Sequence, residues 1–215
     1  MTIELLPILF IALAIVFFVF LYSQFGKRKK KIEIPLAYKK RQQLFTPSES
    51  TFLYALDKAV GKDFRVFGKV RLADIVDTEV YRGVGDKAFS LIAFKHIDFL
   101  LCDCRSLSIL CAIELDDWTH QNEKRQVKDA EKEFALHSAG IPLIRFTVDS
   151  SYKLREIRAK ILGKTNHKVT DLMVPELICP KCGAETIARL AKTGIHKGKL
   201  FIGCSNYPDC RFIKE

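Results

Sequence analysis

The first clear pattern along the chain is an apolar run at residues 5–22 that holds no charged side chain. As a helix, a run of this length can cross a hydrocarbon layer of about 30 Å. Residues 27–31, which follow it, are all basic, whereas a cleaved secretory signal carries its basic residues before the apolar run. The sequence therefore predicts an uncleaved transmembrane anchor at residues 1–26 and a basic juxtamembrane linker at residues 27–44.

The basic run also predicts an orientation, because basic residues beside a membrane span stay on the cytoplasmic side. We expect a single-pass protein with the short N-terminus outside and the bulk of the chain in the cytoplasm, and with the membrane as one of its partners. The cysteines further along then lie in a reducing compartment, which suits zinc thiolates. The alternative is that residues 5–22 form a buried helix of a soluble core.

The middle of the chain, residues 45–166, alternates helical and strand patterns. The motif Thr46-Pro47-Ser48-Glu49 is a capping box with proline at the first helical position, and it predicts a helix start. Val66 and Val70 are spaced for one face of a strand. The predicted strands cover residues 63–72, 96–102, 110–116 and 143–147, and the predicted helices cover residues 46–60, 122–138 and 150–162. This order predicts an α/β domain.

Three carboxylates interrupt the apolar strands of this domain: Asp98 in one, and Glu114 and Asp116 in the next. An unpaired buried carboxylate is costly, and neighbouring carboxylates repel each other. Glu114 and Asp116 share one side of their strand, and an antiparallel partner can bring Asp98 beside them. Such oxygen ligands suit Mg²⁺, which polarises phosphoryl oxygens and prepares water for attack. His120, just past the strand, is a candidate general base or acid.

Four short motifs carry a resemblance to a known family. They are Thr46-Pro47-x-Glu49, Lys95-His96-x-Asp98-Phe99, Ala112-Ile113-Glu114-Leu115-Asp116-Asp117-x-x-His120-Gln121 and Ala139-Gly140-Ile141-Pro142-Leu143. The arrangement resembles the very-short-patch-repair branch of the PD-(D/E)XK, restriction-endonuclease-like superfamily, and more closely an uncharacterised bacterial domain family placed in it. The resemblance implies a nuclease fold in which Asp98 and Glu114 bind Mg²⁺ and in which Glu49, Asp116 and His120 line the catalytic site. With the predicted anchor, it places the chain in the bacterial inner (cytoplasmic) membrane.

One position departs from the pattern of that superfamily. The usual lysine, two residues after the glutamate, is Asp116 in this chain, so His120, or Lys95 from the neighbouring strand, would have to replace it. Short-patch relatives also lack that lysine. Glu49 has a second explanation, because a glutamate at this place completes the capping box of its helix.

The chain ends with two cysteine pairs, Cys179-Pro-Lys-Cys182 and Cys204-Ser-Asn-Tyr-Pro-Asp-Cys210. Two thiolate knuckles at such spacing supply the ligands of a tetrahedral Zn²⁺ site, so we expect a zinc ribbon at residues 175–215. The alternative is a set of free or disulfide-bonded cysteines. A segment this short buries too little apolar surface to fold alone, so the metal would provide much of its folding energy.

The residues around these cysteines carry a second resemblance. The motifs Cys179-Pro-x-Cys182-Gly and Phe201-x-Gly203-Cys204-Ser205-x-Tyr207-Pro208-x-Cys210 closely resemble the C-terminal zinc finger of bacterial type IA DNA topoisomerases. In that family the ribbon binds DNA, often single-stranded. The resemblance therefore implies a contact with nucleic acid.

The distribution of charge agrees with that expectation. The formal net charge is +10, yet residues 42–178 hold twenty basic and twenty acidic side chains, so the excess lies in the basic linker and in the ribbon. Basic side chains supply salt-dependent affinity for phosphates, and aromatic rings stack on bases. The sequence is equally compatible with two roles for the Phe201 ring: packing in the ribbon core and stacking on a base. The predicted nucleic-acid-binding residues are Lys181, Arg189, Lys197, Lys199, Phe201, Tyr207 and Arg211.

The expected fold class is α/β, with an N-terminal transmembrane helix, a restriction-endonuclease-like core at residues 45–166 and a C-terminal zinc ribbon. Two functions follow from it. The first is a membrane-anchored, Mg²⁺-dependent DNA endonuclease whose ribbon grips single-stranded DNA. The second is a non-catalytic protein that tethers DNA to the membrane. A third use of the ribbon, as a module that docks on another protein, also stays open.

Overall fold

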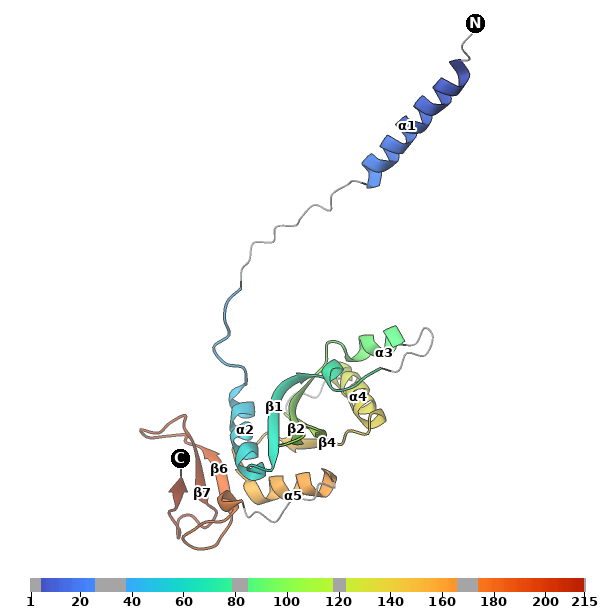
Figure 1. Ribbon diagram of the computed structural model, residues 1–215. Coiled ribbons are helices and arrows are strands. Elements are labelled where there is room, and N and C mark those ends of the chain that lie inside the picture. Colours follow the sequence, from blue (N-terminus) through green and yellow to red (C-terminus); the bar gives the residue numbers. More distant parts are fainter. Residues whose placement is uncertain (1–4, 26–37, 79–84, 118–122, 166–173, 215) are drawn as a thin grey trace. The chain divides into compact units, whose positions relative to one another are not determined.

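A computed structural model describes residues 5–25, 38–78, 85–117, 123–165 and 174–214 (Figure 1). The chain divides into two compact units, Met1–Gln42 and Gln43–Glu215. Residues 27–37 of the predicted basic linker fall outside the described residues. The features that carry the candidate chemistry all belong to the second unit.

The N-terminal unit contains the helix α1 (Leu5–Phe25). Across the part of the chain that the structure describes, no helix is long and apolar enough to cross a membrane. This finding contradicts the predicted transmembrane anchor at residues 1–26. The predicted location in the bacterial inner membrane depended on that anchor, so that prediction is wrong too.

The second unit is built around a four-stranded sheet with the order β1-β2-β3-β4. The first three strands are antiparallel neighbours, and β4 lies parallel to β3. Its strands are β1 (Phe64–Arg71), β2 (His96–Asp103), β3 (Ile109–Asp116) and β4 (Leu143–Thr147). All four strands, and the hairpin between β2 and β3, agree with the predicted pattern.

Helices cover this sheet on both faces (Figure 1). One apolar core contains Phe52 and Leu56 of α2 (Pro47–Val60), Phe99 of β2 and Ile161 of α5 (Leu154–Thr165). The core on the other face contains Leu136 of α4 (Glu123–Ser138), together with residues of η1 (Leu72–Asp74) and α3 (Gly85–Ile92). The sequence did not predict the path of residues 73–93, and the described parts of this segment, 73–78 and 85–93, contribute to the second core.

Lys69 changes the direction of the side chains along β1. Its backbone has φ 56°, in the left-handed region that non-glycine residues seldom adopt. Before it, Val66 packs against the core with α2, whereas after it Val70 packs against the core with α4. The expectation that Val66 and Val70 share one face is therefore wrong, because a left-handed residue between them breaks the strict alternation of a strand.

A second, antiparallel sheet has the order β5-β6-β7-β8 and contains the strands of the ribbon. Its strands are β5 (Ser151–Lys153), β6 (Thr186–Leu190), β7 (Leu200–Cys204) and β8 (Ile213–Lys214). A helix was expected at residues 150–162, but the first residues of that range form β5, and α5 begins only at Leu154. The ribbon strands β6, β7 and β8 therefore share a sheet with β5, which precedes the ribbon in the chain.

Candidate functional site

The four cysteines of the ribbon bring their sulfur atoms within 4.8 Å of one another. The Sγ atoms of Cys179 and Cys210 are 3.7 Å apart, and those of Cys182 and Cys204 are 3.4 Å apart. Zinc–sulfur bonds of about 2.3 Å in a tetrahedron place the sulfurs roughly 3.8 Å apart, so this spacing fits one Zn²⁺. Among the described residues, this is the only cluster of three or more potential ligands. The structure therefore brings the four predicted ligands together, as one zinc ion requires.

The backbone of the first knuckle prepares a thiolate for the metal. Burial raises the pKa of the Cys179 thiol, but the backbone N–H groups of Lys181 and Cys182 lower it to about 7. Gly183 closes the knuckle with φ 74°, and its N–H donates to the carbonyl oxygen of Cys179 at 2.9 Å. The thiolate is the form that binds metal, so these N–H groups favour the metal-binding form of Cys179.

The predicted nucleic-acid-binding residues cluster on the ribbon. Arg189 of β6 and Phe201 of β7 are opposite each other in the sheet, and both are half-buried. The next pair in the register, Ala188 and Ile202, belongs to the core with α2, so the alternation of the strands turns Arg189 and Phe201 to the opposite face. Exposed side chains complete the predicted set: Lys181, Lys197, Lys199, Tyr207 and Arg211. Phe201 thus lies away from the main core.

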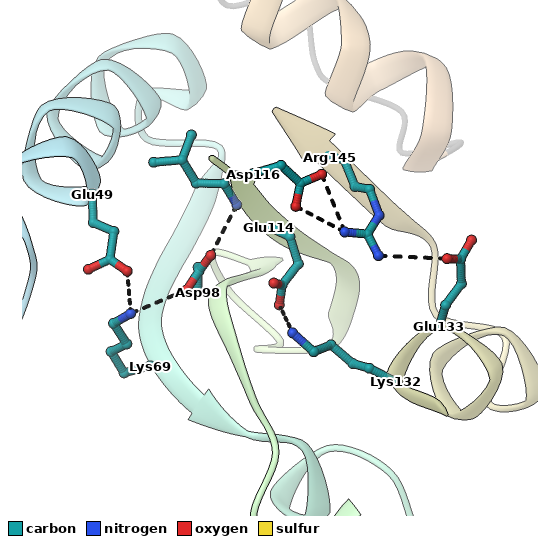
Figure 2. Close-up of polar contacts among 9 residues, drawn as sticks. Glu49, Lys69, Asp98, Glu114, Asp116, Lys132, Glu133 and Arg145 are labelled. Atoms are coloured by element: carbon teal, nitrogen blue, oxygen red, sulfur yellow. Dashed lines mark hydrogen bonds and ion pairs between the residues drawn. The ribbon is translucent and has the colours of Figure 1, made fainter. Parts of the chain in front are cut away.

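Asp98 and Glu114 lie close together on neighbouring strands, β2 and β3. The backbone N–H of Leu115 donates to Oδ2 of Asp98 at 3.0 Å, so Asp98 reaches the backbone next to Glu114. Figure 2 shows the two carboxyl groups between Lys69 and Lys132. The register of these antiparallel strands pairs Phe99 with Ile113, so Asp98 and Glu114 lie opposite each other. The structure thus brings these two predicted residues together.

Glu49 joins this site through Lys69. The Nζ atom of Lys69 is 2.5 Å from Oε1 of Glu49 and 3.2 Å from Oδ1 of Asp98. The other oxygen of Glu49 accepts from the backbone N–H of Thr46 at 2.9 Å, which confirms the capping box. Burial raises the pKa of Glu49, but Lys69 and the Thr46 backbone together hold it below its usual value. Glu49 therefore caps its helix and contacts the site at the same time.

Glu114 is the most buried of the four candidate carboxylates, with 8% of its surface exposed. The Nζ atom of Lys132, on α4, lies 2.8 Å from its Oε1. That oxygen is buried and has no partner with hydrogen-bond geometry among the described residues, so the contact is an ion pair without a well-aligned hydrogen bond. Burial raises the pKa of Glu114, and the ammonium of Lys132 offsets only part of this effect.

Asp116 forms its ion pair with Arg145 of β4. The Nη1 atom of Arg145 donates to Oδ1 and Oδ2 of Asp116 at 3.0 and 3.3 Å, and its Nη2 atom lies 3.6 Å from Glu133 (Figure 2). Both oxygens of Asp116 thus accept from the same guanidinium nitrogen. Asp116 is half-buried at the edge of the site, where it holds Arg145.

Two further sequence expectations concerned the missing lysine. His120 falls outside the described residues. The Nζ atom of Lys95 lies 2.7 Å from Glu131 of α4. Among the described residues, Lys69 is the lysine that forms an ion pair with Asp98.

The sequence did not predict three cations of the site, Arg145, Lys132 and Lys69, although the patterns around the first two indicate them. Arg145 interrupts an apolar strand, as Asp98 does, and it pairs directly with Glu114 in the parallel register. Lys132 lies four residues before the fully buried Leu136, and so on the sheet-facing side of its helix. Lys69 left no comparable signal, because its left-handed backbone depends on the folded structure.

Comparisons with known proteins divide the chain at the ribbon. Residues 41–165 match a family described as "Protein of unknown function (DUF2726)", and residues 176–215 match the family "Topoisomerase DNA binding C4 zinc finger". A curated relative, DNA topoisomerase 1 of Archaeoglobus fulgidus, is 59% identical over 34 residues. That match covers 16% of this chain and 4% of the relative. No solved structure matches the chain. The topoisomerase-type ribbon is confirmed, whereas the PD-(D/E)XK assignment stays a prediction.

Proposed function

The chain belongs to the DUF2726 family, and from the two sites of its second unit we propose that it is a DNA-binding protein that hydrolyses phosphodiester bonds with Mg²⁺. In this proposal the zinc ribbon grips DNA, with single strands favoured. The carboxylates Asp98 and Glu114 hold the Mg²⁺ ion. The observation that carries the proposal is the convergence of these two carboxyl groups from neighbouring strands of a domain that is joined to a topoisomerase-type ribbon.

The arrangement of the ribbon supports the DNA-binding part. Arg189 and Phe201 present a cation beside an aromatic ring, and the exposed Lys197 and Lys199 lie in the connection between their strands. Cations neutralise phosphates, and aromatic rings stack on bases of any sequence. Tyr207, in the second knuckle, is 63% exposed and offers another ring. Stacking on an aromatic ring needs unpaired bases, which is why single-stranded DNA is favoured.

The cost of burying Glu114 supports the hydrolytic part. A carboxylate this buried favours its protonated form unless cations surround it, and its pKa is raised even beside Lys132. Together, Asp98 and Glu114 offer the hard oxygen atoms that Mg²⁺ prefers. A bound Mg²⁺ would supply charge stabilisation at a phosphoryl oxygen and a more acidic water.

A second candidate function is favoured by the lysines of the same site. Lys69 and Lys132 already form ion pairs with Asp98 and Glu114, so these carboxylates are balanced without a metal ion. A domain that has exchanged its divalent cation for ammonium groups would hold DNA without cutting it. This alternative keeps the DNA contact and excludes the hydrolysis.

DNA binding is tested by fluorescence anisotropy of labelled single- and double-stranded oligonucleotides, titrated with the zinc-loaded full-length chain. We expect binding that weakens as salt rises, and a shallower salt dependence for Arg189→Gln with Lys197→Gln. We expect Phe201→Ala to weaken binding by about 1–3 kcal/mol at every salt concentration. Lys87→Gln, an exposed lysine of α3, is the matched control. Unchanged binding after loss of the ribbon cations would refute the proposed interface.

Hydrolysis is tested by incubating the same oligonucleotides with Mg²⁺ present or omitted. Products that need Mg²⁺ and vanish in both Asp98→Asn and Glu114→Gln support the enzyme. Binding that persists in a wild-type chain without any cleavage supports the second candidate. A wild-type chain that neither binds nor cuts nucleic acid at low salt refutes both functions.

A further inference from the structure

Lys69 lies in the proposed site with a backbone conformation that lysine seldom adopts. A left-handed lysine in the middle of a strand is strained, and such strain persists only where the surrounding structure fixes it. Here the neighbouring residue, Gly68, lets the ring of Phe45 approach closely: a Cβ atom on Gly68 would lie 2.2 Å from Cζ of Phe45. The Phe45 ring in turn stacks on Phe99, with ring centroids 5.6 Å apart. Packing thus fixes the backbone beside Lys69.

The left-handed backbone directs the ammonium of Lys69 to two carboxylates. It bridges Glu49 of α2 and Asp98 of β2, and 31% of its side chain stays exposed. An ammonium held between two carboxylates brings a positive charge into the site, where it can neutralise an incoming anion.

The other cations near Asp98 and Glu114 have fixed partners. Arg145 is bound by Asp116 and Glu133, and Lys132 is 12% exposed against Glu114. Lys69 is both more exposed than Lys132 and in contact with Asp98. Of the described lysines that contact these two carboxylates, it is therefore the one with access to an incoming polyanion.

We infer that Lys69 is a resident counter-ion of Asp98 that a divalent cation replaces, and that the freed ammonium then binds the phosphate of the substrate. This inference rests on the proposed function and adds a residue to its site. It predicts opposite effects on two measurements. Removing the charge of Lys69 strengthens metal binding, because a competitor is lost, and it weakens hydrolysis, because a phosphate contact is lost.

The test uses three variants of the zinc-loaded full-length chain. Lys69→Asn removes the charge with a residue that tolerates a left-handed backbone, Lys69→Gly removes the charge and the strain, and Lys69→Arg keeps the charge. Thermal unfolding first shows that each variant folds. Binding of Mn²⁺ is then measured by electron paramagnetic resonance, with Glu114→Gln as the reference that lacks the site, and cleavage of labelled DNA is measured with Mg²⁺.

We expect Mn²⁺ to bind about tenfold more tightly to Lys69→Asn and Lys69→Gly, the amount by which one neighbouring charge typically changes the proton affinity of a carboxylate. Cleavage should fall by about 10²-fold in both variants. It should largely survive in Lys69→Arg. Tighter Mn²⁺ binding together with slower cleavage indicates an effect of charge, because a damaged fold would weaken metal binding as well.

Two outcomes separate this inference from the proposed function. A wild-type chain that cleaves DNA, with Lys69→Asn equal to it in Mn²⁺ affinity and in rate, overturns the role of Lys69 and leaves the hydrolase intact. A wild-type chain that does not cleave, with Mn²⁺ binding still tightened in Lys69→Asn, refutes the hydrolase and supports Lys69 as a resident counter-ion. Absence of Mn²⁺ binding in all variants overturns both.

Discussion

Tyr152 of β5 and Ala188 of β6 are directly opposite each other in an antiparallel pair, although they belong to segments that match two different families. Both residues are buried in the same core as Phe52 of α2, and the rings of Tyr152 and Phe52 lie 5.1 Å apart. The DUF2726 domain thus contributes the edge strand of the ribbon sheet. The folding of the ribbon is therefore linked to that of the α/β domain.

Loss of zinc should consequently destabilise more than the ribbon. The variant Cys182→Ser with Cys204→Ser removes two ligands, and the free energy of metal binding is also folding free energy in such sites. We expect a clearly lower melting temperature for the whole second unit, in a single transition, measured by circular dichroism together with zinc content.

The control for that experiment is Cys104→Ser, which lies outside the quartet and should leave zinc content and melting unchanged. An α/β domain that melts at its wild-type temperature after the ribbon has lost its zinc would contradict the coupling.

Gly68 should not tolerate a side chain. Its missing Cβ leaves room for the ring of Phe45, and Gly68→Ala would force that ring off Phe99. We expect a loss of about 1–3 kcal/mol in the free energy of unfolding, as for other overpacked sites. Gly163→Ala, in α5, is the matched control because nothing lies within 4 Å of its added Cβ, and it should stabilise by about 0.5–1 kcal/mol. Urea denaturation of both variants measures the difference, and equal effects would refute the packing explanation.

Lys132 should matter for stability because its partner is buried. Lys132→Met leaves the carboxylate of Glu114 without its counter-charge, and breaking a buried pair in this way typically costs about 3–5 kcal/mol. Lys153→Met removes an exposed pair with Glu156 and should change stability much less, because water and salt screen exposed charges. The comparison is made by chemical denaturation at pH 7. A small effect of Lys132→Met would mean that Glu114 is already protonated in the folded chain.

Glu49 should make stability depend on acid. Its folded pKa lies below its ordinary value, so its contribution is fully present above about pH 4.5 and is lost as the pH falls through the lower, folded value. Glu49→Gln removes the charge, yet glutamine still completes a capping box. We expect the free-energy difference between wild type and Glu49→Gln to be largest near neutral pH and to shrink below pH 4.5. A difference that does not change with pH would show that only the cap matters.

Local sequence signals predicted the parts of the fold that depend on neighbouring residues. The capping box predicted the start of α2, the short apolar runs predicted the strands of the first sheet, and the paired cysteines predicted the sulfur cluster. The signal for each of these features comes from residues that are close together in the sequence. The carboxylates were also found early, because a charge inside an apolar strand demands a partner.

The features that the sequence did not predict depend on residues far apart in the chain. Lys69 adopts its left-handed backbone beside a packed Phe45, and β5 forms because β6, more than thirty residues later, offers an edge to pair with. A short segment such as residues 151–153 carries too little pattern to distinguish a strand from the start of a helix. The apolar run at residues 5–22 shows the opposite error, since composition alone predicted a membrane span that the described helix does not support.

The most direct test of the central claim is the rate at which the zinc-loaded full-length chain cleaves labelled single-stranded DNA as Mg²⁺ is added. Mg²⁺ is omitted rather than chelated in the control, because a chelator would also remove the zinc. The account predicts cleavage that rises with Mg²⁺ and that is abolished in Asp98→Asn and in Glu114→Gln, with DNA binding retained in both. Wild-type protein that binds this DNA without cutting it, or cleavage that survives in Glu114→Gln, would contradict the account.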